Sequence, residues 1–135
     1  MQEKTLSKRR ETVRKMVECA LLVGVAAVIF GNEPAYDVLE AGEFPGKWQG
    51  DEESYAAVHR FCVDLAATCR GVGSEFMAEI SRLCKGNGKT SIRIDTHRHN
   101  KAMRRMLQKC GFSETGIIYI PEPNSNERIT YEKMI

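Results

Sequence analysis

The sequence lacks the features that mark a disulfide-rich, zinc-binding or membrane-spanning protein. Its five cysteines are odd in number, widely spaced and form no CxxC pair, which excludes a regular disulfide framework and a structural zinc site. A reducing compartment, the cytoplasm, is the simplest inference. The longest apolar run, ALLVGVAAVIF over residues 20–30, is much shorter than the roughly 20 residues of a membrane span.

That apolar run leaves one alternative open, because basic residues between Lys4 and Lys15 precede it as they would in a secretory signal. Glu18 interrupts the stretch close to its start, and no small-residue cleavage site follows at once. A buried strand rich in Val, Leu and Ile is the favoured interpretation.

Strong charge of either sign is also missing. The net charge of +2 is too small to argue for a nucleic-acid partner. A nucleic-acid-binding role for the basic N-terminal arm remains a third alternative, without the interleaved aromatics that would support it. The length of 135 residues, with 42% hydrophobic and 28% charged residues, predicts one soluble globular domain over residues 1–135.

The hydrophobic pattern predicts strands and helices in a definite order. Strands are expected at residues 21–30, 54–63, 91–96, 116–120 and 127–134, with helices at 75–85 and from a cap at Asn100 to a stop at Gly111. The polar N-terminal residues are expected to be either a frayed terminus or a short helix continuing to about Met16, and residues 35–51 a long irregular excursion. Strand, helix and strand between residues 54 and 96 form a βαβ unit, so a mixed α/β (α+β) fold with one parallel pair is expected.

The stretch TCRGVGSEF, residues 68–76, stands where a strand ends and a helix begins. The free N–H groups from Arg70 through Ser74, together with the positive end of the helix, would converge on an anion such as a pyrophosphate. A tight turn that only needs a positive φ at its glycines explains the same letters equally well. A dinucleotide-binding GxGxxG is excluded, because Phe76 stands at the third glycine position.

Other motif-like stretches have plain structural explanations. GNGKTS, residues 86–91, contains the GKT of a P-loop, but Leu83 stands at the first glycine position and the segment joins a helix to a strand. His97 and His99 have no further ligands spaced to join them, so no metal is expected. His59 lies within an apolar strand, where a buried, hydrogen-bonded histidine is the default and a catalytic base the alternative.

Several stretches carry a family resemblance in their order and spacing: VHRFCV, TCRGVGS, IRIDT, HRHN, and MLQKCGF ahead of GIIYI. Over residues 21–135 the sequence thereby resembles the GNAT superfamily of acyl-CoA-dependent N-acetyltransferases. The resemblance implies a mixed, mostly antiparallel sheet with helices on both faces. It also implies that the central parallel strands splay apart to hold acyl-CoA.

The resemblance further implies a cofactor site. In the family, backbone amides of a (Q/R)xxGx(G/A) loop hold the CoA pyrophosphate; both glycines match here, and Thr68 replaces the usual glutamine or arginine. The pantetheine arm is expected to pair with the strand backbone near its end and to lie near the helix-capping asparagine. The residues expected to bind acetyl-CoA are Phe61, Cys62, Val63, Thr68, Cys69, Arg70, Gly71, Val72, Gly73, Ser74, Asn100 and Met103.

The chemistry requires a proton acceptor, because an amine with a pKa of about 10 is mostly protonated at pH 7. His59 occupies a strand position where many relatives carry a glutamate in this role, so the resemblance makes it the expected catalytic residue. The tyrosine that often protonates the departing thiolate is replaced by Leu107. Tyr36, Trp48, His59 and Tyr119 are expected to form the acceptor site.

The expected activity is acetyl transfer from acetyl-CoA, as co-substrate, to a primary amine of a small molecule or peptide. The alternative is a non-catalytic CoA-binding or dimerising remnant of the same fold, which Thr68, Leu107 and an N-terminus shorter than the usual strand–helix–helix portion favour. An exposed sheet edge would also favour a homodimer.

Overall fold

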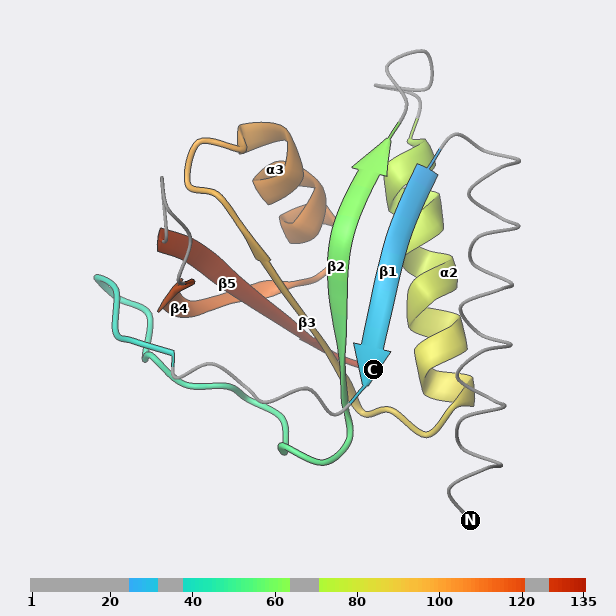
Figure 1. The fold of residues 1–135 in the computed structure, drawn as a ribbon, viewed down its shortest axis with the longest axis horizontal. Coiled ribbons are helices and arrows are strands. Elements are labelled where there is room, and N and C mark those ends of the chain that lie inside the picture. The colour runs from blue at the N-terminus through green and yellow to red at the C-terminus, as the bar shows by residue number, and fades with distance from the viewer. Residues whose placement is uncertain (1–24, 32–37, 64–70, 121–126) are drawn as a thin grey trace.

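The computed structural model describes residues 25–31, 38–63, 71–120 and 127–135 (Figure 1). The helix expected near the N-terminus lies outside these ranges, as do residues 21–24 of the first expected strand. The elements in chain order are β1 (Val25–Gly31), β2 (Tyr55–Val63), α2 (Val72–Gly86), β3 (Ser91–Thr96), α3 (Lys101–Lys109), β4 (Ser113–Tyr119) and β5 (Glu127–Met134). Among the described helices, none is long and apolar enough to cross a bilayer.

The strands form one mixed sheet in the order β1-β2-β3-β5-β4. β2 and β3 are parallel, whereas β1–β2, β3–β5 and β4–β5 are antiparallel. The parallel pair follows from the crossover through α2, because a helix returns the chain to the same end of the sheet. The predicted mostly antiparallel sheet with a central βαβ pair is confirmed. The two described helices, α2 and α3, share one face, so helices on both faces stay a prediction.

β2 and β3 separate soon after they begin. Their register runs only from Tyr55↔Ser91 to Ala57↔Arg93. Beyond these residues β2 continues beside β1, and β3 continues beside β5 as far as Thr96. The two strands diverge in Figure 1. We call the opening between residues 58–63 of β2 and 94–96 of β3 the fork; it confirms the expected splay.

A β-bulge in β2 lies within the fork. Between the pairs Val28↔His59 and Ala26↔Cys62 the chain advances two residues on β1 but three on β2. Arg60 takes up the extra residue with a φ of 53°. The bulge shifts the phase of side-chain alternation, so that Phe61 packs on the same face as the apolar residues before it.

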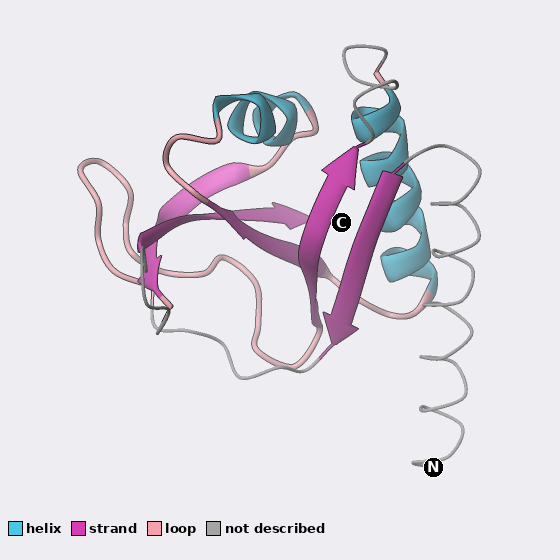
Figure 2. Ribbon diagram, turned by 45° about the horizontal axis from the view of Figure 1, so that its top comes forward, coloured by secondary structure: helices cyan, strands magenta, loops and turns pink. Residues whose placement is uncertain are grey.

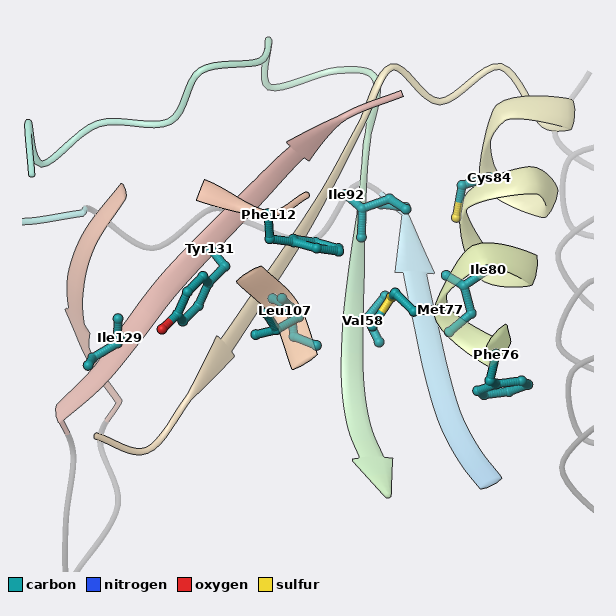
Figure 3. Close-up of a cluster of buried hydrophobic side chains, with 12 residues drawn as sticks. Val58, Phe76, Met77, Ile80, Cys84, Ile92, Leu107, Phe112, Ile129 and Tyr131 are labelled. Atoms are coloured by element: carbon teal, nitrogen blue, oxygen red, sulfur yellow. The ribbon is translucent and has the colours of Figure 1, made fainter. Parts of the chain in front are cut away.

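α2 and α3 pack against one face of the sheet. Ile92 and Ile94 of β3 point to this face, as period-two alternation requires, and both belong to the apolar core. Figure 2 shows α2 alongside β1 and β2, and Figure 3 shows the buried side chains between helix and sheet. The core consists of Ala56, Val58, Phe76, Met77, Ile80, Cys84, Ile92, Ile94, Leu107, Phe112, Ile129 and Tyr131.

A long connection, residues 38–54, covers the opposite face, and we call it the strap. Its first part reaches the far edge of the sheet, where Leu39 and Ile117 exchange backbone hydrogen bonds of 2.8 and 3.1 Å. It then returns to the start of β2, where the carboxylate of Asp51 accepts hydrogen bonds from the backbone N–H groups of Glu53 and Ser54. These bonds lower the pKa of the Asp51 carboxyl, with the Ser54 bond the largest cause.

Ile80, which is fully buried beneath the sheet, offers a test of the core. Ile80→Ala is expected to lower the free energy of unfolding by about 2–5 kcal/mol, because it removes apolar contacts and leaves a cavity. Urea unfolding measures the change. Leu39→Ala, at a side chain that is 47% exposed, is the matched control and should cost less than about 1 kcal/mol. Equal losses for the two variants would contradict this assignment of the core.

Candidate functional site

The N-terminus of α2 opens at the mouth of the fork. Gly71 is the N-cap residue, with φ 76° and ψ 1°, and no side chain caps the helix. The N–H groups of the first turn have no partners within the helix, and the helix dipole places partial positive charge there. A Cβ at Gly71 would meet nothing within 4 Å. The positive φ, rather than any close contact, is what favours glycine here, and the described residues leave the space above this backbone open.

Gly73 is required for a different reason. A Cβ at this position would lie 2.9 Å from Sδ of Met106 and 3.3 Å from Cγ2 of Val63. The missing side chain lets the first turn of α2 pack closely against the end of β2 and against α3. The rings of Phe61 and Phe76, 5.9 Å apart, reinforce this contact. The helix terminus and the end of β2 are therefore held together. Thr68, Cys69 and Arg70 lie outside the described residues.

The β3-facing edge of β2 is the second feature of the site. Cys62 and Val63 pair with Ala26 and Val25 of β1 on one side. Within the described residues no strand pairs with their other edge, because the pairing of β2 with β3 ends at Ala57. Backbone N–H and C=O groups along such an edge can bind an extended ligand as an added strand would.

The remaining residues assigned to the cofactor lie on α3. The Oδ1 atom of Asn100 accepts a hydrogen bond from the backbone N–H of Met103 at 3.2 Å, which confirms the predicted helix cap. Met103 packs against the core. Leu107 has no exposed surface and places only apolar atoms where the family resemblance implies a tyrosine. A contact of Asn100 or Met103 with a cofactor stays a prediction.

His59 lies on β2 immediately before the bulge. Ala56 and Val58 face the helices, so alternation places the half-buried His59 on the strap face. Trp48 lies over the same face, with its ring centroid 4.5 Å from Cζ of Arg93. Arg93 is the register partner of Ala57, two residues before His59. His59 and Trp48 therefore lie on the same face of the sheet.

The other two acceptor-site predictions have different outcomes. Tyr36 lies outside the described residues. Tyr119 is 48% exposed at the end of β4, where it pairs with Glu127. Since Ile117, two residues earlier, packs against the core, alternation places Tyr119 on the helix face. The structure does not bring Tyr119 together with Trp48 and His59.

Two buried charged residues near the proposed acceptor site were not predicted from the sequence. Arg93 and Glu132 form a salt bridge of 3.1 Å on the strap face. In the sequence, Arg93 reads as part of the solvated face of an alternating strand. The available signal was the unusually long irregular connection, residues 35–51, which carries aromatic residues able to cover such a face.

A separate polar network lies on the helix face. Nε of Arg104 donates a hydrogen bond to the hydroxyl of Tyr131 at 3.0 Å, and that hydroxyl donates to Glu114 at 2.7 Å. Burial is the main cause that raises the pKa of Tyr131 to about 12, so its hydroxyl stays protonated at neutral pH. This network joins α3 to β4 and β5. Among the described residues, no cluster of three or more His, Cys, Asp or Glu side chains could hold a metal ion.

Comparison with known proteins shows that this fold is the one found in GNAT acetyltransferases. The model of the acetyltransferase (GNAT) family matches residues 17–112. A GNAT-family acetyltransferase from Streptococcus agalactiae is 25% identical, with a TM-score of 0.67 over 83% of this chain and 59% of that protein. A GCN5-related N-acetyltransferase from Kribbella flavida is 19% identical, with a TM-score of 0.58 over 82% of this chain and 60% of that protein.

A third similar structure is the microcin C7 self-immunity acetyltransferase, solved in complex with acetyl-CoA and AMP. It is 19% identical, with a TM-score of 0.53 over 61% of this chain and 47% of that protein. This chain thus spans about 60% or less of the length of each of these three proteins. No curated protein sequence matches it significantly.

The close packing at Gly73 can be measured by a pair of substitutions. Gly73→Ala is expected to lower the free energy of unfolding by about 1 kcal/mol, because the new Cβ displaces Sδ of Met106, the end of a flexible side chain, and presses on Cγ2 of Val63. Met106→Ala removes that sulfur, so the double variant should be more stable than the sum of the two single losses predicts. Additive losses in denaturant unfolding would show that the two residues do not contact each other.

Proposed function

Because the chain belongs to the acetyltransferase (GNAT) family, we propose that it transfers an acetyl group from acetyl-CoA to a primary amine of a small molecule or peptide. The observation that carries the proposal is the fork, which opens after Ala57 and has the uncapped N-terminus of α2 at its mouth. These two features fit the two parts of CoA: an extended pantetheine arm and a pyrophosphate.

The residues present suit this ligand. The first-turn N–H groups of α2 would bind the pyrophosphate, and Gly71 leaves the space that close approach of a phosphate requires. The free edge of β2 from Phe61 to Val63 would pair with the pantetheine amides. A backbone N–H of this bulged segment would donate a hydrogen bond to the thioester carbonyl and stabilise the negative charge that develops there.

Acetyl transfer then needs one proton removed and another supplied. The amine nitrogen forms a bond to the carbonyl carbon, the C–S bond breaks, and the sulfur leaves as a thiolate. His59 lies on the strap face, at the bulge, and takes the amine proton either directly or through a water molecule. Leu107 has no proton to give, so the thiolate is protonated by solvent or by another group.

A second candidate, a CoA-binding protein without catalysis, is favoured by one observation. Leu107 is completely buried at the position where relatives often carry the acid.

A cytoplasmic location and a homodimer also stay predictions. The described cysteines Cys62, Cys84 and Cys110 are free thiols, as a reducing compartment would leave them.

Binding and turnover separate the two candidates. Saturating acetyl-CoA is expected to raise the melting temperature, since a ligand that binds only the folded state stabilises it. Release of free CoA thiol is then followed with a panel of primary amines. Stabilisation without turnover across the panel would favour the non-catalytic candidate, and no stabilisation would contradict both.

His59→Ala tests the proposed base. Turnover is expected to fall by about 100-fold or more, a typical contribution of general-base catalysis, while the Kd for acetyl-CoA changes less than about twofold. His99→Ala, at an exposed histidine of the β3–α3 loop, is the matched control and should leave both values unchanged. A parallel loss of turnover and acetyl-CoA binding in His59→Ala would make His59 a structural residue.

A further inference from the structure

The Arg93–Glu132 salt bridge is the most deeply buried ion pair among the described residues. The two side chains are 4% and 0% exposed, and the pair links neighbouring strands β3 and β5 at register partners. Both lie on the strap face, because they alternate with Ile92 and Tyr131, which belong to the core on the helix face.

Both charged groups also bind the backbone of the strap. Glu132 accepts hydrogen bonds from the backbone N–H groups of Gln49 and Gly50, and from the hydroxyl of Ser91 at 2.9 Å. Nη2 of Arg93 donates to the carbonyl oxygens of Gly50 at 3.0 Å and Asp51 at 3.1 Å. The pair therefore holds three consecutive strap residues, 49–51, against the sheet.

Gly50 is the residue that permits this approach. A Cβ at this position would lie 2.7 Å from Oγ of Ser91 and 2.9 Å from Oε1 of Glu132. Any larger residue would push the strap away from the carboxylate. The absence of a side chain at Gly50 therefore lets the strap backbone come close enough to hydrogen-bond with Glu132 and Arg93.

The pinned segment also fixes the ring of Trp48. Cζ of Arg93 lies 4.5 Å from the ring centroid of Trp48 and 4.1 Å from that of Tyr55, within the range of cation–π contacts. Arg93 is the register partner of Ala57, the last paired residue before the fork. Trp48 is therefore held at the base of the fork, on the face that carries His59.

Stability alone is a poor explanation of this arrangement. Replacing a buried ion pair by apolar side chains of similar size is often neutral or stabilising, because two charges no longer have to be desolvated. Attraction of a charged ligand is also a poor explanation, because the charges of Arg93 and Glu132 compensate each other. Hydrogen bonds to the strap backbone are what apolar residues at these positions could not supply.

We propose that Arg93 and Glu132 are positioning residues for acceptor recognition. By fixing residues 48–51 of the strap, they hold Trp48 at the base of the fork, on the face that carries His59, where it forms one wall for the incoming amine. The inference rests on the proposed acetyltransferase function and assigns selection of the acceptor to the strap rather than to the helices.

Trp48 is the only tryptophan of the chain, so its fluorescence reports on the strap directly. In Glu132→Gln, the strap N–H groups lose their carboxylate. We expect the emission of Trp48 to shift to longer wavelength and its quenching by acrylamide to increase. Glu114→Gln, which alters the carboxylate of the Arg104 pair on the opposite face, is the matched control and should leave the emission unchanged.

Kinetics test the link to the acceptor. Glu132→Gln is expected to raise the KM for the amine by about tenfold, the effect of losing hydrogen bonds to one charged group, while the KM for acetyl-CoA changes less than about twofold. Trp48→Ala should give the same split, and Trp48→Phe should restore most of the affinity for the amine. Glu114→Gln should alter neither KM.

A double variant keeps the test valid if Glu132→Gln fails to fold. Arg93→Met combined with Glu132→Leu preserves buried volume and removes both charges, so this double variant should melt near the wild-type temperature. Its Trp48 emission should nevertheless shift to longer wavelength, and its KM for the amine should rise without a change in the KM for acetyl-CoA, as expected for Glu132→Gln. Unchanged Trp48 emission in a folded variant, or a released strap with an unchanged KM for the amine, would overturn the inference and leave the proposed function standing. Absence of turnover in the wild-type protein would overturn both.

Discussion

β2 pairs with β1 along most of its length but with β3 only from Tyr55 to Ala57, and the other features of the site are arranged around that limit. A sheet that continued its pairing would use every backbone N–H and C=O group of its central strands. Because the pairing stops, no strand of the described ranges pairs with the inner edge of β2 beside the start of α2. Gly73 brings that helix terminus against Val63, so two sets of backbone donors meet at one place.

The two faces of the sheet are built from different interactions. On the helix face, apolar side chains such as Ile80 and Ile92 pack with little exposed surface. On the strap face, hydrogen bonds to Arg93 and Glu132 attach a segment that has no regular secondary structure. Since polar contacts of this kind depend on direction more than apolar contacts do, the strap face can hold Trp48 in a defined position without a helix beneath it.

Local signals were sufficient to predict much of the fold. The strands at Ser91–Thr96 and Glu127–Met134 match their predicted bounds, and Asn100 caps α3 as expected. α2 begins three residues before the predicted start at Glu75, because Gly71 enters the helix from a left-handed conformation and no polar side chain marks the boundary.

Features that join distant residues were less predictable. The bulge at Arg60 has a local signal, because the apolar residues of β2 change phase between Val58 and Phe61, yet a continuous strand fits the letters as well. The contact between Arg93 and Glu132 joins residues 39 positions apart, and no periodicity of one segment reveals it. Tyr119 was assigned to the acceptor site although its face depends on the register of β4 with β5.

The proposed site relies on backbone groups more than on side chains, so a departure from the family pattern at one side chain does not by itself remove it. The first-turn N–H groups of α2 and the edge of β2 exist whatever side chain stands at Thr68, provided that Gly71 and Gly73 keep the helix start in place. The same reasoning applies to the strap, whose carbonyl and N–H groups at Gly50 are held by buried partners. A change at Gly71 or Gly73 should therefore affect binding of the cofactor more than a change at Thr68.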